Sequence, residues 1–154
     1  MRALLMELRP SALAEARLED LLRQLGEAAA GREGIPVSVQ TNGSCSLPPE
    51  VHIALYRIAQ EALNNALKHA RAGNISIQLG ALHSQSKSQA LNPGVQLVIR
   101  DDGRGFDPAH TPPDHLGLKI MRERAQSVGA NLEIESQIGK GTQIIVQWEN
   151  SQYN

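Results

Sequence analysis

The segment RIAQEALNNALKHA carries an acid, an amide and a cation at helical spacing, namely Glu61, Asn65 and Lys68. At about 100° per residue, these side chains lie within about 60° of one another on a helix, and His69 falls in the apolar arc beside them. Four polar groups of different chemistry therefore share the border of a buried face. A solvated helix edge with i, i+4 hydrogen bonds and one core histidine is the alternative interpretation.

A second polar cluster, DDGRG at residues 101–105, begins where an apolar strand is predicted to end. Gly103 and Gly105 allow positive φ and let a flat ligand approach the backbone. A carboxylate at Asp101 can accept a hydrogen bond from an exocyclic amine, whereas it repels phosphates. The pattern predicts the base end of a nucleotide site, with a tight Gly/Asp turn as the alternative.

Two further glycine motifs lie nearer the C-terminus. HLGLK at residues 115–119 places a glycine at the start of a predicted helix, where free N–H groups and the helix dipole favour phosphate oxygens. A simple helix N-cap is the alternative. GKGT at residues 139–142 is a tight turn into the last predicted strand, and most proteins use such a turn as a hairpin.

Hydrophobic periodicity predicts the elements that position these motifs. Helices are expected from Ser11 to about Gly34, from Leu47 to about Arg71, and from Gly117 to Val128. Strands are expected at residues 35–40, 74–80, 95–100, 131–136 and 142–148. The apolar stripe of the middle helix comprises Val51, Leu55, Ile58, Ala59, Ala62 and Ala66. Residues 81–93 are interpreted as an exposed connection and residues 103–116 as a mobile loop. Five strands with three main helices predict an α+β two-layer sandwich.

Composition argues against several classes of function. The 154 residues include 15 Lys plus Arg against 16 Asp plus Glu, which gives no electrostatic footprint for nucleic acid or an anionic membrane. Aromatic residues make up 3%, too few for a base-stacking platform. Cys45 is the single cysteine, so we expect no intrachain disulfide and a reduced, cytoplasmic setting. No apolar stretch approaches the roughly 20 residues of a membrane span, although a longer parent protein is free to be membrane-anchored.

The four motifs together resemble the ATP-binding catalytic domain of bacterial sensor histidine kinases, within the larger group that includes gyrase and MutL ATPases. RIAQEALNNALKHA, DDGRGFDP, HLGLKIMRERAQSVGA and GKGT are similar to its N, G1, G2 and last glycine boxes. The resemblance spans Leu13 to Trp148, and KHA and GLKIMRERA resemble the short-lid subfamily of the nitrate/nitrite sensors. It implies a Bergerat-type fold, in which a mixed five-stranded sheet packs against three main helices.

The resemblance assigns roles at the phosphate end of the site. It implies that Asn65 coordinates the Mg²⁺ that bridges the phosphates, and that Lys68 and His69 lie near phosphate or ribose oxygens. Glu61 stands where ATP-hydrolysing relatives hold a water-activating base, so Glu61 and Asn65 are the expected catalytic residues. The residues expected to close over the phosphates are His115, Leu116, Gly117 and Leu118.

The resemblance also assigns the base end. Asp101 would accept the adenine amine, with Gly103 and Gly105 beside the ring and Thr142 supporting Asp101. The expected cofactors are therefore ATP and Mg²⁺.

The phosphoacceptor histidine of such kinases is expected upstream. In this subfamily an acidic residue follows the acceptor, and none of the five histidines fits. RALLMELRP resembles the end of a dimerisation-domain helix, so we divide the chain into that helix end at residues 1–10, an ATP-binding catalytic domain at 11–150 and a tail at 151–154. The isolated chain is expected to be monomeric and unable to phosphorylate itself. Its expected partners are the upstream dimerisation domain and a response regulator.

Two other functions remain open. An anti-sigma serine kinase or related switch protein uses the same ATP fold to bind a protein partner, although MRERA and ELRP argue against it. An ATP hydrolase of the gyrase group normally carries a longer lid and a transducer domain. Phosphorylation of a serine on a small partner would favour the first, and phosphate release abolished by Glu61→Ala would favour the second.

Overall fold

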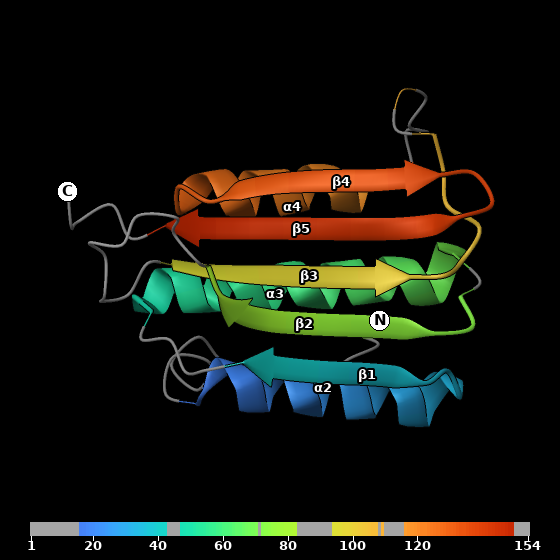
Figure 1. Cartoon of the computed structure of the whole chain (residues 1–154), viewed down its shortest axis with the longest axis horizontal. Coiled ribbons are helices and arrows are strands. Elements are labelled where there is room, and N and C mark those ends of the chain that lie inside the picture. Colours follow the sequence, from blue (N-terminus) through green and yellow to red (C-terminus); the bar gives the residue numbers. More distant parts are fainter. Residues whose placement is uncertain are drawn as a thin grey trace.

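Helices cover one face of a five-stranded sheet (Figure 1). The computed structural model describes residues 16–42, 47–70, 72–82, 94–107, 109 and 116–149, with the backbone alone at 69, 70 and 116. Its elements are α2 (Leu18–Glu33), β1 (Val37–Asn42), α3 (Pro49–Asn65), η1 (Ala66–Ala70), β2 (Ile75–Ala81), β3 (Gly94–Asp101), α4 (Leu116–Ser127), β4 (Asn131–Gln137) and β5 (Gly141–Glu149). The predicted α+β two-layer sandwich is confirmed. In these ranges no helix is both long and apolar enough to cross a bilayer.

The strands follow the order β1-β2-β3-β5-β4. β1 and β2 are parallel and the other neighbours are antiparallel, so the sheet is mixed, as predicted. A parallel pair needs a crossover connection, and the segment that contains α3 and η1 supplies it. The register aligns Ile75, Asp101, Thr142 and Ser136 in one row across β2, β3, β5 and β4, at the end of the sheet where β3 finishes.

The core lies between the sheet and α3, which runs between α2 and α4 (Figure 1). Every residue of the predicted apolar stripe of α3 is at most 4% exposed. Along β3, Val95, Leu97 and Ile99 are buried, whereas Arg100 is exposed on the uncovered face. This alternation places Asp101 on the helix-covered face, although it is a charged residue.

The first predicted helix begins later in the structure than its sequence pattern indicates. Ser11 lies outside the described residues, but Arg17 is described with extended backbone, and α2 begins at Leu18. Its end agrees with the prediction, because Gly34 adopts the left-handed conformation at φ 71° and its N–H bonds the carbonyl of Ala30. Acidic side chains in the first turn of α2 interact favourably with the helix dipole and so stabilise the helix.

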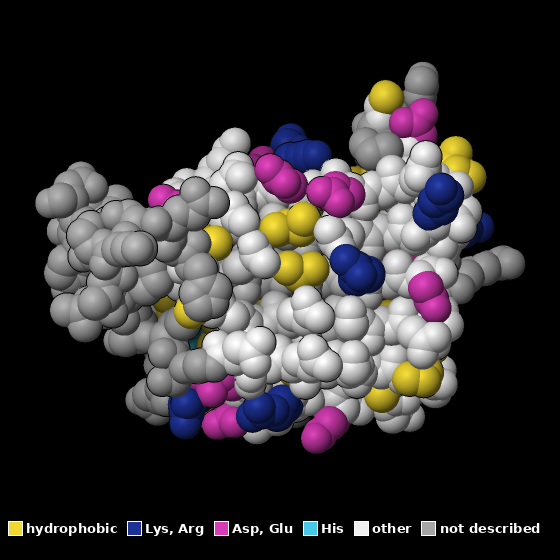
Figure 2. Space-filling view, viewed as in Figure 1, with side chains coloured by type: hydrophobic (Ala, Val, Ile, Leu, Met, Phe, Trp, Pro, Cys, Tyr) yellow, Lys and Arg dark blue, Asp and Glu magenta, His cyan; other side chains and the backbone are white. Residues whose placement is uncertain are grey.

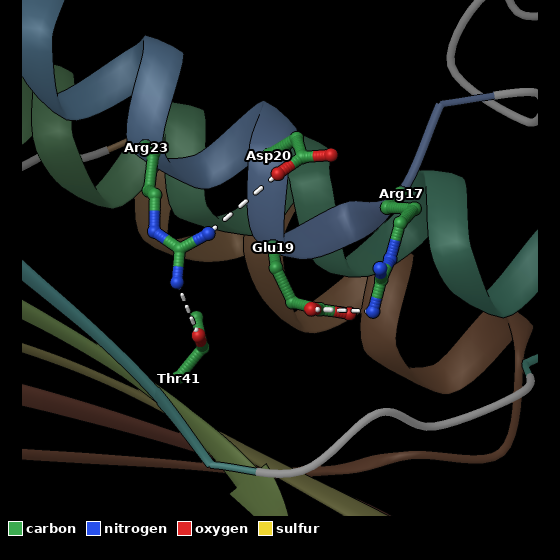
Figure 3. A network of polar contacts seen from close by, with 5 residues as sticks. All are labelled: Arg17, Glu19, Asp20, Arg23 and Thr41. Atoms are coloured by element: carbon green, nitrogen blue, oxygen red, sulfur yellow. Dashed lines mark hydrogen bonds and ion pairs between the residues drawn. The ribbon is translucent and has the colours of Figure 1, made fainter.

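One hydrogen bond joins α2 to β1, and two ion pairs lie at the start of α2 (Figure 3). The Nη2 of Arg23 donates to the Oγ1 of Thr41 at 2.8 Å, and its Nη1 lies 3.6 Å from Asp20. A separate ion pair joins Arg17 and Glu19 at 2.9 Å. The side chains of Arg17, Asp20 and Arg23 are at least half exposed, so we expect these ion pairs to contribute little net stability.

The long predicted helix is not regular throughout. It changes at Ala66 from α-helix to the π-helix η1. The wheel used for the sequence assumed 100° per residue, and a wider turn shifts every position after Asn65. The predicted angle of Lys68 therefore does not hold, whereas Glu61 and Asn65 lie in the regular α-helix to which the 100° spacing applies.

Candidate functional site

The first turn of α4 packs directly against the polar edge of α3. A Cβ atom placed on Gly117 would lie 2.5 Å from the Oε1 of Glu61 and 3.1 Å from the Oδ1 of Asn65. Only a glycine lets the helix approach this closely without displacing those side chains. Two motifs far apart in sequence are thus adjacent, and an acid and an amide lie beside the helix start, whose first N–H groups have no partner within the helix.

Of the other residues predicted for the phosphate end, the structure describes the side chains of two, Lys68 and Leu118, that lie in helices beside this site. Lys68 is exposed in η1. Leu118 is 8% exposed and its side chain belongs to the core, so a ligand would meet its backbone. His115 and the side chains of His69 and Leu116 lie outside what the structure describes, and their roles stay predictions.

Asp101 is a buried carboxylate at the end of β3. Its side chain is on the covered face and only 9% of the residue is exposed. The N–H of Gly103 donates to its Oδ1 at 2.9 Å. Burial raises the pKa of Asp101, backbone hydrogen bonds from Gly103 and Thr142 oppose that rise, and the net direction is upward. A buried acceptor with few partners is stabilised by any ligand that donates to it.

The side chain of Asp102 lies on the opposite side from that of Asp101, and its role is structural. Its Oδ1 accepts from the N–H groups of Gly73 at 2.7 Å and Asn74 at 2.8 Å, and its Oδ2 accepts from Asn74 Nδ2 at 3.1 Å. These hydrogen bonds lower the pKa of Asp102. The residue therefore clamps the segment entering β2 to the end of β3. No role is predicted for Asp102 from the sequence, although strand alternation allows only one of two adjacent carboxylates to face the covered side.

Backbone packing explains two of the motif glycines. Gly105 has φ 63°, and a Cβ there would lie 2.1 Å from the carbonyl oxygen of Gln137. Gly141 has φ 85°, and its Cβ would lie 2.1 Å from the carbonyl oxygen of Asp101. We expected the space at Gly105 to admit a ligand, but the end of β4 and the start of β5 occupy it. Contact of Gly105 with a ligand by another edge stays a prediction.

Hydrogen bonds attach the start of the loop after β3 to β4 and to the turn that follows it. The N–H of Phe106 donates to Ser136 Oγ at 2.9 Å and the carbonyl of Arg104 accepts from Gly139 at 2.7 Å. The mobility of residues 103–116 stays a prediction. Ser136 also lies 2.8 Å from Thr142 Oγ1. Ser136 is not predictable as a site residue from the sequence, because its place beside Thr142 depends on strand register.

Two open hollows flank this end of the sheet. One, of about 600 Å³, has a lining that includes Asp101, Thr142 and Gln143. The other, of about 200 Å³, has a lining that includes Asn74, Asp101 and Asp102. Glu61 and Asn65 line neither, so the candidate site rests on converging side chains and not on a closed cavity. The described part of the uncovered sheet face is mostly uncharged, without a basic patch (Figure 2).

Comparisons with known proteins agree with this arrangement. Residues 50–152 match the family described as Histidine kinase-, DNA gyrase B-, and HSP90-like ATPase. Sensor histidine kinase LiaS of Bacillus subtilis is 33% identical over 147 residues, which cover 96% of this chain and 38% of that protein. Oxygen sensor histidine kinase NreB of Staphylococcus carnosus is 34% identical over 147 residues, which cover 95% of this chain and 40% of that protein. The chain therefore spans about two fifths of the length of these relatives.

Solved structures show the same fold. The histidine kinase domain of the blue-light activated histidine kinase from Erythrobacter litoralis has a TM-score of 0.67 at 26% identity, over 88% of this chain and 62% of that one. The mycobacterial sensor histidine kinase MprB has a TM-score of 0.65 at 19% identity, over 87% of this chain and 95% of that one. At this lower identity the likeness to MprB concerns the fold alone.

Proposed function

Because the chain belongs to the histidine kinase-, DNA gyrase B- and HSP90-like ATPase family, we propose that it is the ATP-binding catalytic domain of a sensor histidine kinase. Membership in this family implies ATP binding. The named relatives are sensor histidine kinases, which favours this function over the anti-sigma kinase and the gyrase-type hydrolase. The proposed catalytic domain occupies residues 11–150.

One observation carries the proposal: the start of α4 packs on Glu61 and Asn65 of α3, at the sheet end that holds Asp101. The α4 N-terminus favours phosphate oxygens, because its N–H groups and its dipole point toward an anion. The buried carboxylate repels phosphates and accepts from an amine. A nucleotide therefore fits with its base at Asp101 and its phosphates at the helix start.

Mg²⁺ fits the phosphate end through hard oxygen donors. Asn65 Oδ1 and Glu61 Oε1 both lie at the start of α4. Within the described ranges, no group of three or more His, Cys, Asp or Glu could hold a metal ion. We assign Asn65 as the protein ligand, and the nucleotide phosphates would supply most of the rest. When bound, the ion neutralises phosphate charge and orients the γ-phosphoryl group.

The proposed reaction is phosphoryl transfer to a histidine on an upstream dimerisation domain. A nitrogen of that imidazole attacks the γ-phosphorus, the bond from this phosphorus to the β,γ-bridging oxygen breaks, and ADP leaves with the electron pair. The phosphorylated ring then releases to solvent the proton on its other nitrogen. Transfer of this kind needs positioning and charge neutralisation, which the helix start, Asn65 and Lys68 would supply. A response regulator would next receive the phosphoryl group.

Calorimetry with a pair of isosteric variants tests the proposal. The wild-type chain should bind ATP with Mg²⁺ in the micromolar to sub-millimolar range, and GTP should not bind. Asp101→Asn should weaken ATP binding by about 10- to 100-fold, because it replaces a charged acceptor of the base amine. Asp102→Asn, the matched control at the next residue, should retain ATP affinity within about threefold. A folded wild-type chain that binds no ATP would refute the proposal.

A further inference from the structure

Two hydroxyl side chains face each other beside Asp101. Ser136 on β4 and Thr142 on β5 have their oxygens 2.8 Å apart. The register sets Thr142 directly opposite Asp101 and Ser136 directly opposite Thr142, on the covered side of the sheet. Both hydroxyl residues are half-buried. Their hydrogen bonds therefore control which polar groups Thr142 offers to a ligand at Asp101.

Only one arrangement of protons lets all three contacts of Ser136 be hydrogen bonds at once. A hydroxyl has one hydrogen to donate and two lone pairs that accept. Ser136 Oγ accepts from the N–H of Phe106 at 2.9 Å and lies 3.1 Å from the carbonyl oxygen of Gly141. That carbonyl can only accept, so it takes the single Ser136 hydrogen. The contact with Thr142 is then a hydrogen bond only if Thr142 donates.

The hydrogen of Thr142 is consequently used within the protein, and its Oγ1 keeps only lone pairs for a ligand or bridging water. We infer that Ser136 is a positioning residue that makes Thr142 an acceptor, so that the base end presents two acceptors and selects a ligand edge that donates. This inference rests on the proposed nucleotide function. The 6-amino group of adenine has two hydrogens, one for each acceptor, whereas guanine and hypoxanthine have a carbonyl oxygen at that position, so two acceptors facing position 6 favour adenine.

Hydroxyl exchange tests the inference without nucleotide. The deuterium isotope shift at Thr142 Cβ, measured by NMR in mixed light and heavy water, reports how fast the Thr142 hydroxyl proton exchanges. Loss of its acceptor in Ser136→Ala should speed this exchange about fivefold. Ser136→Thr retains an acceptor and should keep exchange slow, and Ser38→Ala on exposed β1 is the control for serine loss in a strand. An exchange rate unchanged in Ser136→Ala would overturn the inference.

Nucleotide selectivity gives the second readout. In Ser136→Ala, the freed Thr142 hydroxyl can donate to the carbonyl oxygen of inosine triphosphate. The preference for ATP over inosine triphosphate should therefore fall about fivefold, with ATP affinity itself reduced less than threefold. A purely structural role of Ser136 would weaken both nucleotides equally, and an unchanged ratio would refute the inference. Wild-type protein that binds no ATP would refute the proposed function instead, and the exchange measurement would still decide the role of Ser136.

Discussion

Two adjacent carboxylates at the end of β3 illustrate how strand alternation separates a binding group from a structural one. Asp101 faces the covered side, where burial raises its pKa. Asp102 faces the other side, where hydrogen bonds from Asn74 and Gly73 lower its pKa. The charged form is therefore disfavoured at the first position and favoured at the second.

These opposite directions predict opposite effects on stability. The folded-state pKa of Asp102 lies below its unfolded value, so its hydrogen bonds stabilise the fold above the unfolded pKa and are lost as pH falls through the folded pKa. Asp102→Asn should lower the melting temperature near neutral pH, and the difference from wild type should shrink below about pH 4. Thermal unfolding between neutral and acidic pH measures this.

Asp101→Asn is expected to change the melting temperature in the opposite direction. Folding raises the pKa of Asp101, so its charged form costs stability at neutral pH and protonation relieves that cost. The variant should melt at the same temperature as wild type or higher at neutral pH, although its nucleotide binding is weakened. If Asp101→Asn destabilised the chain as much as Asp102→Asn, the division of tasks between the two carboxylates would be wrong.

The contact between α3 and α4 depends on a glycine whose neighbours are side-chain ends. At Gly117 an added Cβ meets Glu61 and Asn65, and these side chains can move. At Gly141 an added Cβ meets the backbone of Asp101, which cannot move without disturbing the sheet. A substitution at Gly117 is therefore expected to disturb the site, whereas one at Gly141 is expected to disturb the fold.

Gly117→Ala should impair binding more than folding. The methyl group displaces Glu61 and Asn65 from the start of α4, so we expect ATP affinity to fall about tenfold with a change in unfolding free energy below about 1 kcal/mol. Gly31→Ala is the matched control, because it is also helical and nothing lies within 4 Å of its added Cβ. That control should be neutral or stabilising. Calorimetry measures the ATP affinity of both variants, and chemical denaturation measures their unfolding free energy. Unaltered ATP binding by Gly117→Ala would contradict the prediction.

The assembled domain gathers its candidate groups at one end of the sheet. The arrowhead of β3 and the last turns of α3 and η1 lie at this end (Figure 1). None of the chain's five histidines is followed by an acidic residue, which is the pattern expected of the acceptor. Nucleotide binding and phosphoacceptance are thus proposed to belong to different segments of a longer protein.

This division predicts complementation between chains. Incubated alone with radiolabelled ATP and Mg²⁺, the chain should form no phosphohistidine. Mixed with a parent protein that carries Asp101→Asn, the wild-type chain should restore label on the parent, since one supplies ATP binding and the other the acceptor. Acid-labile, base-stable label on the isolated chain would show that an acceptor lies within it.

Local pattern was sufficient for much of the fold. The buried stripe of α3 and the inward residues of β3 follow from helix and strand periodicity, because each pattern is set by a few neighbouring residues. The same reasoning placed Asp101 at a strand end, and the order of the motifs supported the family resemblance. It failed where geometry departs from the ideal, at the π-helix after Asn65 and at the start of α2.

The remaining features arise where segments distant in the chain meet. Strand order and the parallel pairing of β1 with β2 depend on how the crossover packs, and no local pattern encodes that. The fit of Gly117 on Glu61, the Asp102 clamp and the partnership of Ser136 with Thr142 each require register and helix placement. Sequence identifies which groups the chain carries, whereas long-range packing sets their partners, because a hydrogen bond depends on distances of a few tenths of an ångström that spacing along the chain does not specify.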